Sequence, residues 1–119
     1  MEIQCKRVYQ AAGPDDGSRI LVDRVWPRGM TKEQVQADRW LKDLAPSNAL
    51  RKWFGHDRSN WEEFKRRYFV ELDAHPEALA ALLAEAEKTR VTLLFSAHDA
   101  ECNQAIALRD YLLAWRRSH

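Results

Sequence analysis

The segment VTLLFS (91–96) constrains the fold more than any other part of the chain, because it is an uninterrupted apolar run of strand length. A strand with one face in water alternates apolar and polar residues, whereas a parallel strand covered on both faces does not. We therefore expect residues 91–96 to form the central strand of a parallel sheet. A parallel neighbour requires a long, right-handed crossover connection.

Two further segments, IQCKRVY (3–9) and RILVDRVW (19–26), have the composition of strands. Helical patterns fill the rest of the chain, where apolar residues recur at spacings of three and four. Their expected starts are capping boxes at 31–34 and 59–62, a serine cap at Ser47, Pro76 in a first turn, and the residue after Asp99. Segment 38–47 is predicted to end near Pro46, and Gly55 to stop the helix that Ser47 opens.

Together these patterns predict a single α/β domain over residues 1–119. We expect a small three-layer domain with a short, mostly parallel sheet of about three strands flanked by helices. The connection between the second and last strands is predicted to be an entirely helical insert.

Composition limits the classes of partner. The chain has 19 basic and 18 acidic residues and a net charge of +1, so any basic site must be local. Cys5 and Cys102 form no metal-binding or disulfide pattern, and Cys102 is expected to be a packed, inert thiol. No apolar stretch approaches the roughly 18 residues that span a bilayer, and the N-terminus lacks a signal-peptide pattern. We expect a soluble, cytoplasmic protein that makes no membrane contact.

The stretch LVDRVWPRGM (21–30) ends the second strand with charged and aromatic residues. Ligands of open α/β sheets bind beyond the carboxyl ends of the strands. If the strand stays regular, Arg24, Trp26 and Arg28 share one face, and Pro27 holds Trp26 extended. Two guanidinium groups beside an indole suit a phosphate or another planar anion. Alternatively, the arginines fasten the insert by pairing with carboxylates, for which the candidates are Asp23, Asp38, Asp43 and Asp57.

SAHD (96–99) follows the last strand and supplies further candidates. Ser96 is a candidate nucleophile, although no GxSxG elbow surrounds it. Asp99 is either a helix cap or a catalytic carboxylate, and backbone N–H groups of 99–102 would face an anion at the strand ends. His56, in a turn between helices, is a candidate acid or base. With His98 it makes only two histidines, so no metal site is predicted and the cofactor is unknown.

Several segments taken together resemble the YeaO-like branch of the DUF488 family. They are RILVDRVWPRGMTKE, WLKDLAPS, LRKWFGHD, WEEFKRRY and VTLLFSAHD, followed by an asparagine. The resemblance extends over nearly the whole chain. It implies a compact bacterial or archaeal α/β domain, and no family-wide reaction comes with it.

Longer relatives in the wider family carry an aspartate-valine-arginine segment at the end of the second strand. They also carry cysteine-glutamate and cysteine-histidine-arginine patterns near the start of the last helix. Here Val22-Asp23-Arg24 occupies the first place with its order altered, while Phe95, Ala97 and Asn103-Gln104-Ala105 occupy the others. A mechanism built on that cysteine, glutamate or histidine therefore does not transfer to this chain.

The favoured hypothesis is a binder of, or enzyme for, a small anionic molecule that is phosphorylated or nucleotide-like. Its residues divide by expected role. Arg24 and Arg28 would hold the anion beside Trp26 and Pro27, Ser96 and Asn103 would orient the ligand, and Asp23, Asp99, Ser96 or His56 would supply any catalysis.

The alternative is a nucleic-acid-associated or protein-interaction module without catalysis. Basic residues outside the strand ends would carry nucleic-acid binding, although acidic residues flank several of them. They are Arg51, Lys52, Lys65, Arg66, Arg67, Arg116 and Arg117.

Overall fold

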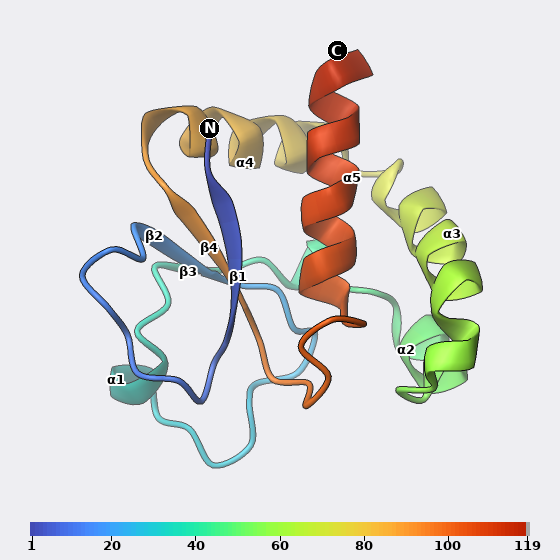
Figure 1. Cartoon of the computed structure of the whole chain (residues 1–119), viewed down its shortest axis with the longest axis horizontal. Helices are drawn as coiled ribbons and strands as arrows, with labels where there is room; N and C mark the ends of the chain where they lie inside the picture. The colour runs from blue at the N-terminus through green and yellow to red at the C-terminus, as the bar shows by residue number, and fades with distance from the viewer. Residues whose placement is uncertain (119) are drawn as a thin grey trace.

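The apolar run forms strand β4 (Val91–Phe95), in which every residue is buried. In the computed structural model, which describes residues 1–118, β4 pairs in parallel with β1 (Ile3–Arg7) on one side and β2 (Ser18–Leu21) on the other. A two-residue strand, β3 (Arg39–Trp40), continues the sheet beyond β2, giving the order β1-β4-β2-β3. The prediction of a central parallel strand is confirmed (Figure 1).

Short helical elements precede three long helices in the chain. They are α1 (Lys32–Val35), the 3₁₀ turn η1 (Lys42–Leu44), α2 (Asn48–Phe54), the 3₁₀ turn η2 (Arg58–Asn60), α3 (Trp61–Leu72), α4 (Pro76–Lys88) and α5 (Gln104–Ser118).

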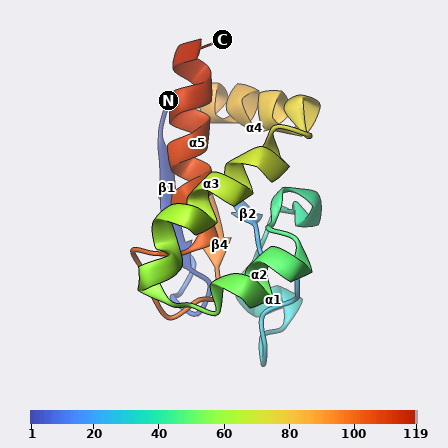
Figure 2. The same cartoon turned by 90° about the vertical axis from the view of Figure 1, so that its right-hand side faces the viewer.

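The two faces of the sheet are covered differently. Helices α3, α4 and α5 lie on one side of the sheet (Figures 1 and 2). Ile20 and Leu93 belong to the main core that these helices share with the sheet. Leu21 and Leu94 point into a smaller cluster with Val35 of α1. The mixed α/β architecture with a parallel sheet flanked by helices is therefore confirmed, and the second face is covered by α1 and loops.

The apolar stripes predicted for the three long helices are buried in the main core, as their spacing required. The buried members are Phe64, Tyr68, Leu72, Leu79, Leu82, Leu83, Ala86, Ala105, Leu108 and Leu112. Trp61 and Trp115 end two of these stripes and pack against the same core while partly exposed.

The insert between β2 and β4 is not entirely helical. It adds a strand, so the sheet has four strands where about three were expected. Segment 38–47 contributes β3, whose Arg39 and Trp40 pair with Ile20 and Leu21. The indole Nε1 of Trp40 also donates to the carbonyl oxygen of Asp23 at 2.7 Å. Two residues are too few to produce a strand periodicity, so only the open edge of β2 explains their extended conformation.

The second strand ends at Leu21, five residues earlier than expected. The N–H of Val22 still donates to the carbonyl of Leu94 at 3.1 Å, and the chain then bends away. The predicted alternation of Arg24, Trp26 and Arg28 on one strand face is therefore wrong. Their positions follow from the loop, not from the pleat of a strand.

Four of the predicted helix signals are confirmed, among them Pro76, which is the first residue of α4. Thr31 and Gln34 form the reciprocal capping box of α1, and Ser47 caps α2, which ends at a left-handed Gly55. The second capping box is wrong, because α3 begins at Trp61 without a side-chain cap. Asp57 instead accepts the N–H of Ser59 at 2.9 Å and caps the turn η2.

We predict that Gly17→Ala destabilises the protein much more than Gly29→Ala does. Both glycines have left-handed φ angles, 64° and 76°. That conformation alone costs an alanine about 1–2 kcal/mol. A Cβ at Gly17 would in addition lie 2.1 Å from the carbonyl oxygen of Arg90, whereas a Cβ at Gly29 meets nothing within 4 Å. Urea unfolding of the two variants tests this, and equal losses would contradict it.

Candidate functional site

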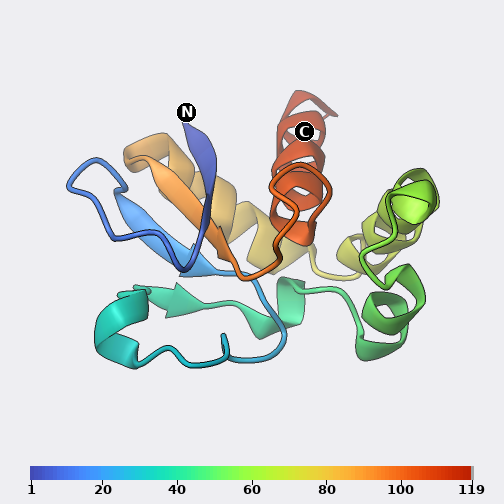
Figure 3. The ribbon, with the colours of Figure 1, turned by 60° about the horizontal axis from the view of Figure 1, so that its bottom comes forward.

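The loops that follow β1, β2 and β4 leave the sheet at the same end and come together there (Figure 3). They surround, with α2, α3 and the start of α5, a cavity of about 940 Å³. All nine residues predicted to form the site line this cavity. The full lining is Arg7, Tyr9, residues 23–28, Pro46, Arg51, Phe54, His56, Phe64, residues 96–99, Asn103 and Gln104.

Arg24 holds the insert through backbone carbonyl groups. Its Nε donates to the oxygen of Pro46 at 2.8 Å and its Nη2 to that of Ala45 at 3.1 Å. The alternative that the arginines fasten the insert therefore describes Arg24, although its partners are not the expected carboxylates. Because carbonyl groups carry no net charge, the charge of the guanidinium is retained at the cavity wall.

Arg28 and Arg51 are exposed at the cavity, and neither has an acidic partner in residues 1–118. The carbonyl of Arg28 accepts the hydroxyl of Tyr9 at 3.0 Å, which ties the loops after β1 and β2 together. Arg51 makes a long hydrogen bond of 3.3 Å to Asn48. Both guanidinium groups are thus available to a ligand.

Arg7 is a site residue that the sequence patterns did not indicate. Its Nε donates to the carbonyl of Ala97 at 3.0 Å, and its Nη2 lies 3.1 Å from Nδ1 of His98. Its guanidinium also lies over the ring of Tyr9, 4.6 Å from the centroid. The same rule that placed Arg24 at a strand end would have found Arg7, the last residue of β1.

Trp26 packs mainly against protein. Its indole N–H donates to the carbonyl of Met30 at 2.7 Å, and its ring meets that of Trp40 edge to face at 5.4 Å. Pro27 beside it is buried. These contacts hold the turn that presents Arg28, while one side of the indole lines the cavity.

Asp23 is the buried carboxylate of the cavity, with only 6% of its surface exposed. The amide of Gln104 donates to Oδ1, whereas Oδ2 is buried and has no hydrogen-bond partner within the described residues. Burial raises the pKa of Asp23, and Ser96, Gln104 and the charge of Arg51 act in the opposite direction. Ser96 thus lies beside Asp23, without reaching Oδ2 in hydrogen-bond geometry.

The carboxylate of Asp99 already accepts hydrogen bonds from other residues of the protein. Arg58 donates to both of its oxygens, at 2.7 and 2.8 Å, and the N–H groups of Glu101 and Cys102 donate to Oδ1. These hydrogen bonds, the one from Arg58 first, lower its pKa to about 2. A carboxylate with so low a pKa is a weak base near neutral pH.

The last helix does not begin directly after Asp99 as expected. It begins at Gln104, and Asn103 caps it by accepting the N–H of Ile106 at 3.0 Å. The amide nitrogen of Asn103 donates to the carbonyl of Asp99 at 2.8 Å. The expected ligand-facing N–H groups of 99–102 are therefore partly used by Asp99, and both ends of the Asn103 amide already have partners within the protein.

His56 lines the cavity from the turn that follows α2. It has a left-handed φ of 58°, is exposed, and contacts the ring of Phe54 at 6.2 Å. Within residues 1–118, no three histidine, cysteine or acidic side chains are grouped as metal ligands would be. Burial raises the pKa of the Cys102 thiol, so the helix start does not activate it.

The family model described as the inactive DUF488-N3 subclade matches residues 2–118. The chain belongs to the DUF488 family. It is 44% identical over 112 residues to the uncharacterised protein YeaO of Escherichia coli K12, covering 94% of this chain and 97% of that one. An uncharacterised protein of Mycobacterium tuberculosis H37Rv is 43% identical over 86 residues, which are 72% of this chain and 69% of that relative.

These DUF488 relatives confirm the resemblance that the sequence motifs carried. No solved structure matches the chain. Among residues 1–118, no helix has both the length and the apolar character that crossing a membrane requires.

We predict that Arg24→Ala lowers the free energy of unfolding by about 1.5–3 kcal/mol, because two charge-assisted hydrogen bonds to the insert are lost. Arg28→Ala should change it by less than about 0.5 kcal/mol, since its guanidinium forms no ion pair within the described residues. Chemical denaturation of both variants measures the difference. Equal stabilities would show that Arg24 does not fasten the insert.

We also predict that Asp23→Asn is at least as stable as the wild type near neutral pH. Burial raises the pKa of Asp23 above the ordinary value of 3.8, so the unfolded chain loses this proton first as the pH rises. The free energy of unfolding contributed by this group therefore falls as the pH rises through that range, and the asparagine avoids the loss. Urea unfolding near neutral pH and in acid should show the advantage of the variant only near neutral pH.

Proposed function

We propose that this DUF488 protein binds a small anionic molecule, phosphorylated and nucleotide-like, in the cavity at the strand ends. The proposal rests on the positive charge of the cavity wall. Four guanidinium groups, of Arg7, Arg24, Arg28 and Arg51, line it against two carboxylates. In residues 1–118 none of the four forms a direct ion pair with a carboxylate, although the charge of Arg51 acts on Asp23.

The two acidic residues offset only part of this charge. Asp99 is matched by Arg58, which donates to both of its oxygens. Asp23 is then a single carboxylate beside four guanidinium groups. Guanidinium groups bind phosphate oxygens through parallel hydrogen bonds, which makes an oxyanion the natural ligand of such a wall.

Size and apolar surface favour a ligand larger than a free phosphate. A volume of about 940 Å³ lies in the range of sites for cofactor-sized molecules. Phe54 and Phe64, whose rings stack 4.3 Å apart, form part of the wall on the insert side. A flat aromatic base beside a phosphate would use both the apolar and the cationic parts.

Binding without turnover is the form of the proposal that we favour. The matching family model is described as an inactive subclade. Of the expected catalytic groups, Asp99 has its pKa lowered to about 2 by Arg58 and two N–H groups and is a weak base. Ser96 has no histidine among its hydrogen-bond partners within the described residues.

The nucleic-acid alternative has less support. The basic run of α3 is paired with acidic residues of the same helix, Lys65 with Glu62 and both Arg66 and Arg67 with Glu63. Phosphate groups would have to displace these carboxylates, which weakens the expected electrostatic attraction.

Isothermal titration calorimetry with nucleoside monophosphates and inorganic phosphate tests the proposal. We expect Arg28→Ala and Arg51→Ala each to weaken nucleotide binding by roughly tenfold, the loss of about one charge-assisted hydrogen bond. Binding should also weaken as salt is added, because exposed charges are screened.

Arg117→Ala is the matched control, because Arg117 is also exposed but lies at the far end of α5 and does not line the cavity. Its affinity for the nucleotide should equal that of the wild type. The absence of binding by every anion tested, or equal weakening in the control, would overturn the proposal.

A further inference from the structure

We infer that Asp23 recognises the uncharged end of the ligand, by accepting at Oδ2 a hydrogen bond from a ligand hydroxyl or amino group. The inference rests on the proposed function and narrows it. The ligand would be a nucleoside phosphate with free donor groups, held by arginines at its phosphate and by Asp23 at its sugar or base.

The state of the Asp23 carboxylate is the first observation. The residue is 6% exposed, lines the cavity, and has one oxygen occupied by Gln104. The other oxygen, Oδ2, is buried without a partner among residues 1–118. A buried acceptor without a donor costs free energy, and a ligand that supplies the donor recovers it.

Two hydrogen bonds within the protein hold Asp23 in position. Trp40 donates to its carbonyl oxygen at 2.7 Å, and Gln104, at the start of α5, holds Oδ1. The residue is thus held at the cavity wall, and because Oδ2 itself is buried, a ligand donor reaches it once the carboxylate turns toward the cavity.

The surroundings favour a neutral donor over a cation. The arginines that line the same cavity would repel an ammonium group, and the described residues offer no third ligand for a metal ion. A hydroxyl or an amino group of a base can donate to a carboxylate without bringing positive charge to this wall.

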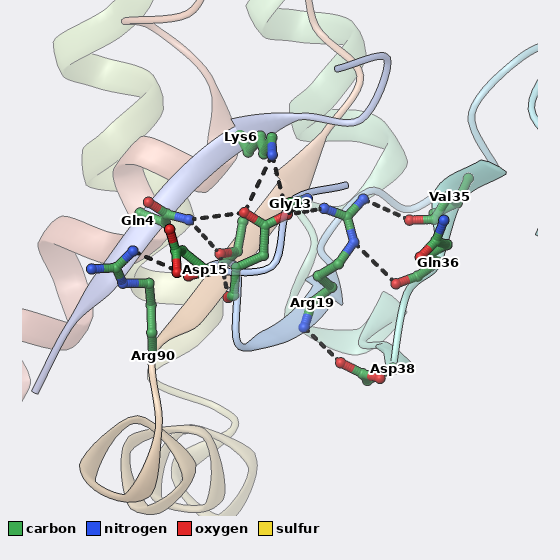
Figure 4. Close-up of polar contacts among 11 residues, drawn as sticks. Gln4, Lys6, Gly13, Asp15, Arg19, Val35, Gln36, Asp38 and Arg90 are labelled. Carbon is green, nitrogen blue, oxygen red and sulfur yellow. Dashed lines mark hydrogen bonds and ion pairs between the residues drawn. The ribbon is translucent and has the colours of Figure 1, made fainter. Parts of the chain in front are cut away.

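Asp16 is a buried aspartate whose carboxylate is bound by donors within the protein. It is 5% exposed, and Figure 4 shows Lys6, Gly13 and Arg19 directed at one carboxyl group, which is that of Asp16. Burial alone would raise its pKa, but the hydrogen bonds from Gly13, Lys6 and Arg19 outweigh burial and lower it. Asp16 does not line the cavity, so it is a matched control for Asp23.

The experiment compares Asp23→Asn with Asp16→Asn in calorimetry with guanosine monophosphate and inorganic phosphate. Asp23→Asn replaces Oδ2 by an N–H donor of the same size. We expect it to weaken guanosine monophosphate binding by roughly tenfold or more, to leave phosphate binding unchanged, and to keep its stability. Asp16→Asn should lose stability and bind both ligands like the wild type.

A second measurement compares ligand analogues in the wild-type chain and in Asp23→Asn. Guanosine monophosphate is compared with its 2′,3′-dideoxy form, which lacks the sugar hydroxyls, and with inosine monophosphate, which lacks the 2-amino group. One of the two should bind more weakly than guanosine monophosphate, and this loss should vanish in Asp23→Asn, as expected for a direct contact. The weaker ligand tells whether the sugar or the base supplies the donor.

The outcomes separate the two proposals. If Asp23→Asn binds guanosine monophosphate as the wild type does, or if neither analogue loses affinity, the role of Asp23 is wrong and the anion-binding cavity stands. If the wild type binds neither nucleotide nor phosphate, the proposed function fails and this inference fails with it.

Discussion

The parallel pairing of β4 with both β1 and β2 is the constraint on which the rest of the structure depends. Because all three strands run in the same direction, the segments after Arg7, Leu21 and Phe95 emerge at one end of the sheet. That shared edge brings arginines and an aspartate from distant parts of the chain to one cavity. β4 can occupy the centre because each of its five residues is buried.

Backbone carbonyl groups hold two arginines of the cavity wall in place without neutralising their charge. Arg24 donates to the carbonyls of Ala45 and Pro46, and Arg7 donates to that of Ala97. A carboxylate in those positions would have offset the charge, as Glu63 does in part for Arg66 and Arg67. The same hydrogen bonds thus attach the insert to the strand ends and leave the guanidinium charge for a ligand.

Elements with a repeated pattern were predictable, and those without one were not. The stripes of α3, α4 and α5 and the run of β4 follow from the spacing of apolar residues. β3 was missed because two residues carry no period and their pairing depends on the open edge of β2. The start of α5 was misplaced because Asp99 and Asn103 are both good caps, and the bond from Ile106 to Asn103 decides between them.

The sequence by itself determined the α/β class, the central strand, the DUF488 family and nine residues that line the cavity at the strand ends. Periodicity and turn chemistry are local, so a single sequence contains them. Only the tertiary structure decided that Arg24 binds carbonyls. It also decided that, within residues 1–118, Arg28 and Arg51 have no acidic partner and one oxygen of Asp23 is buried without a donor. Those facts depend on contacts between residues far apart in the chain, which no local pattern encodes.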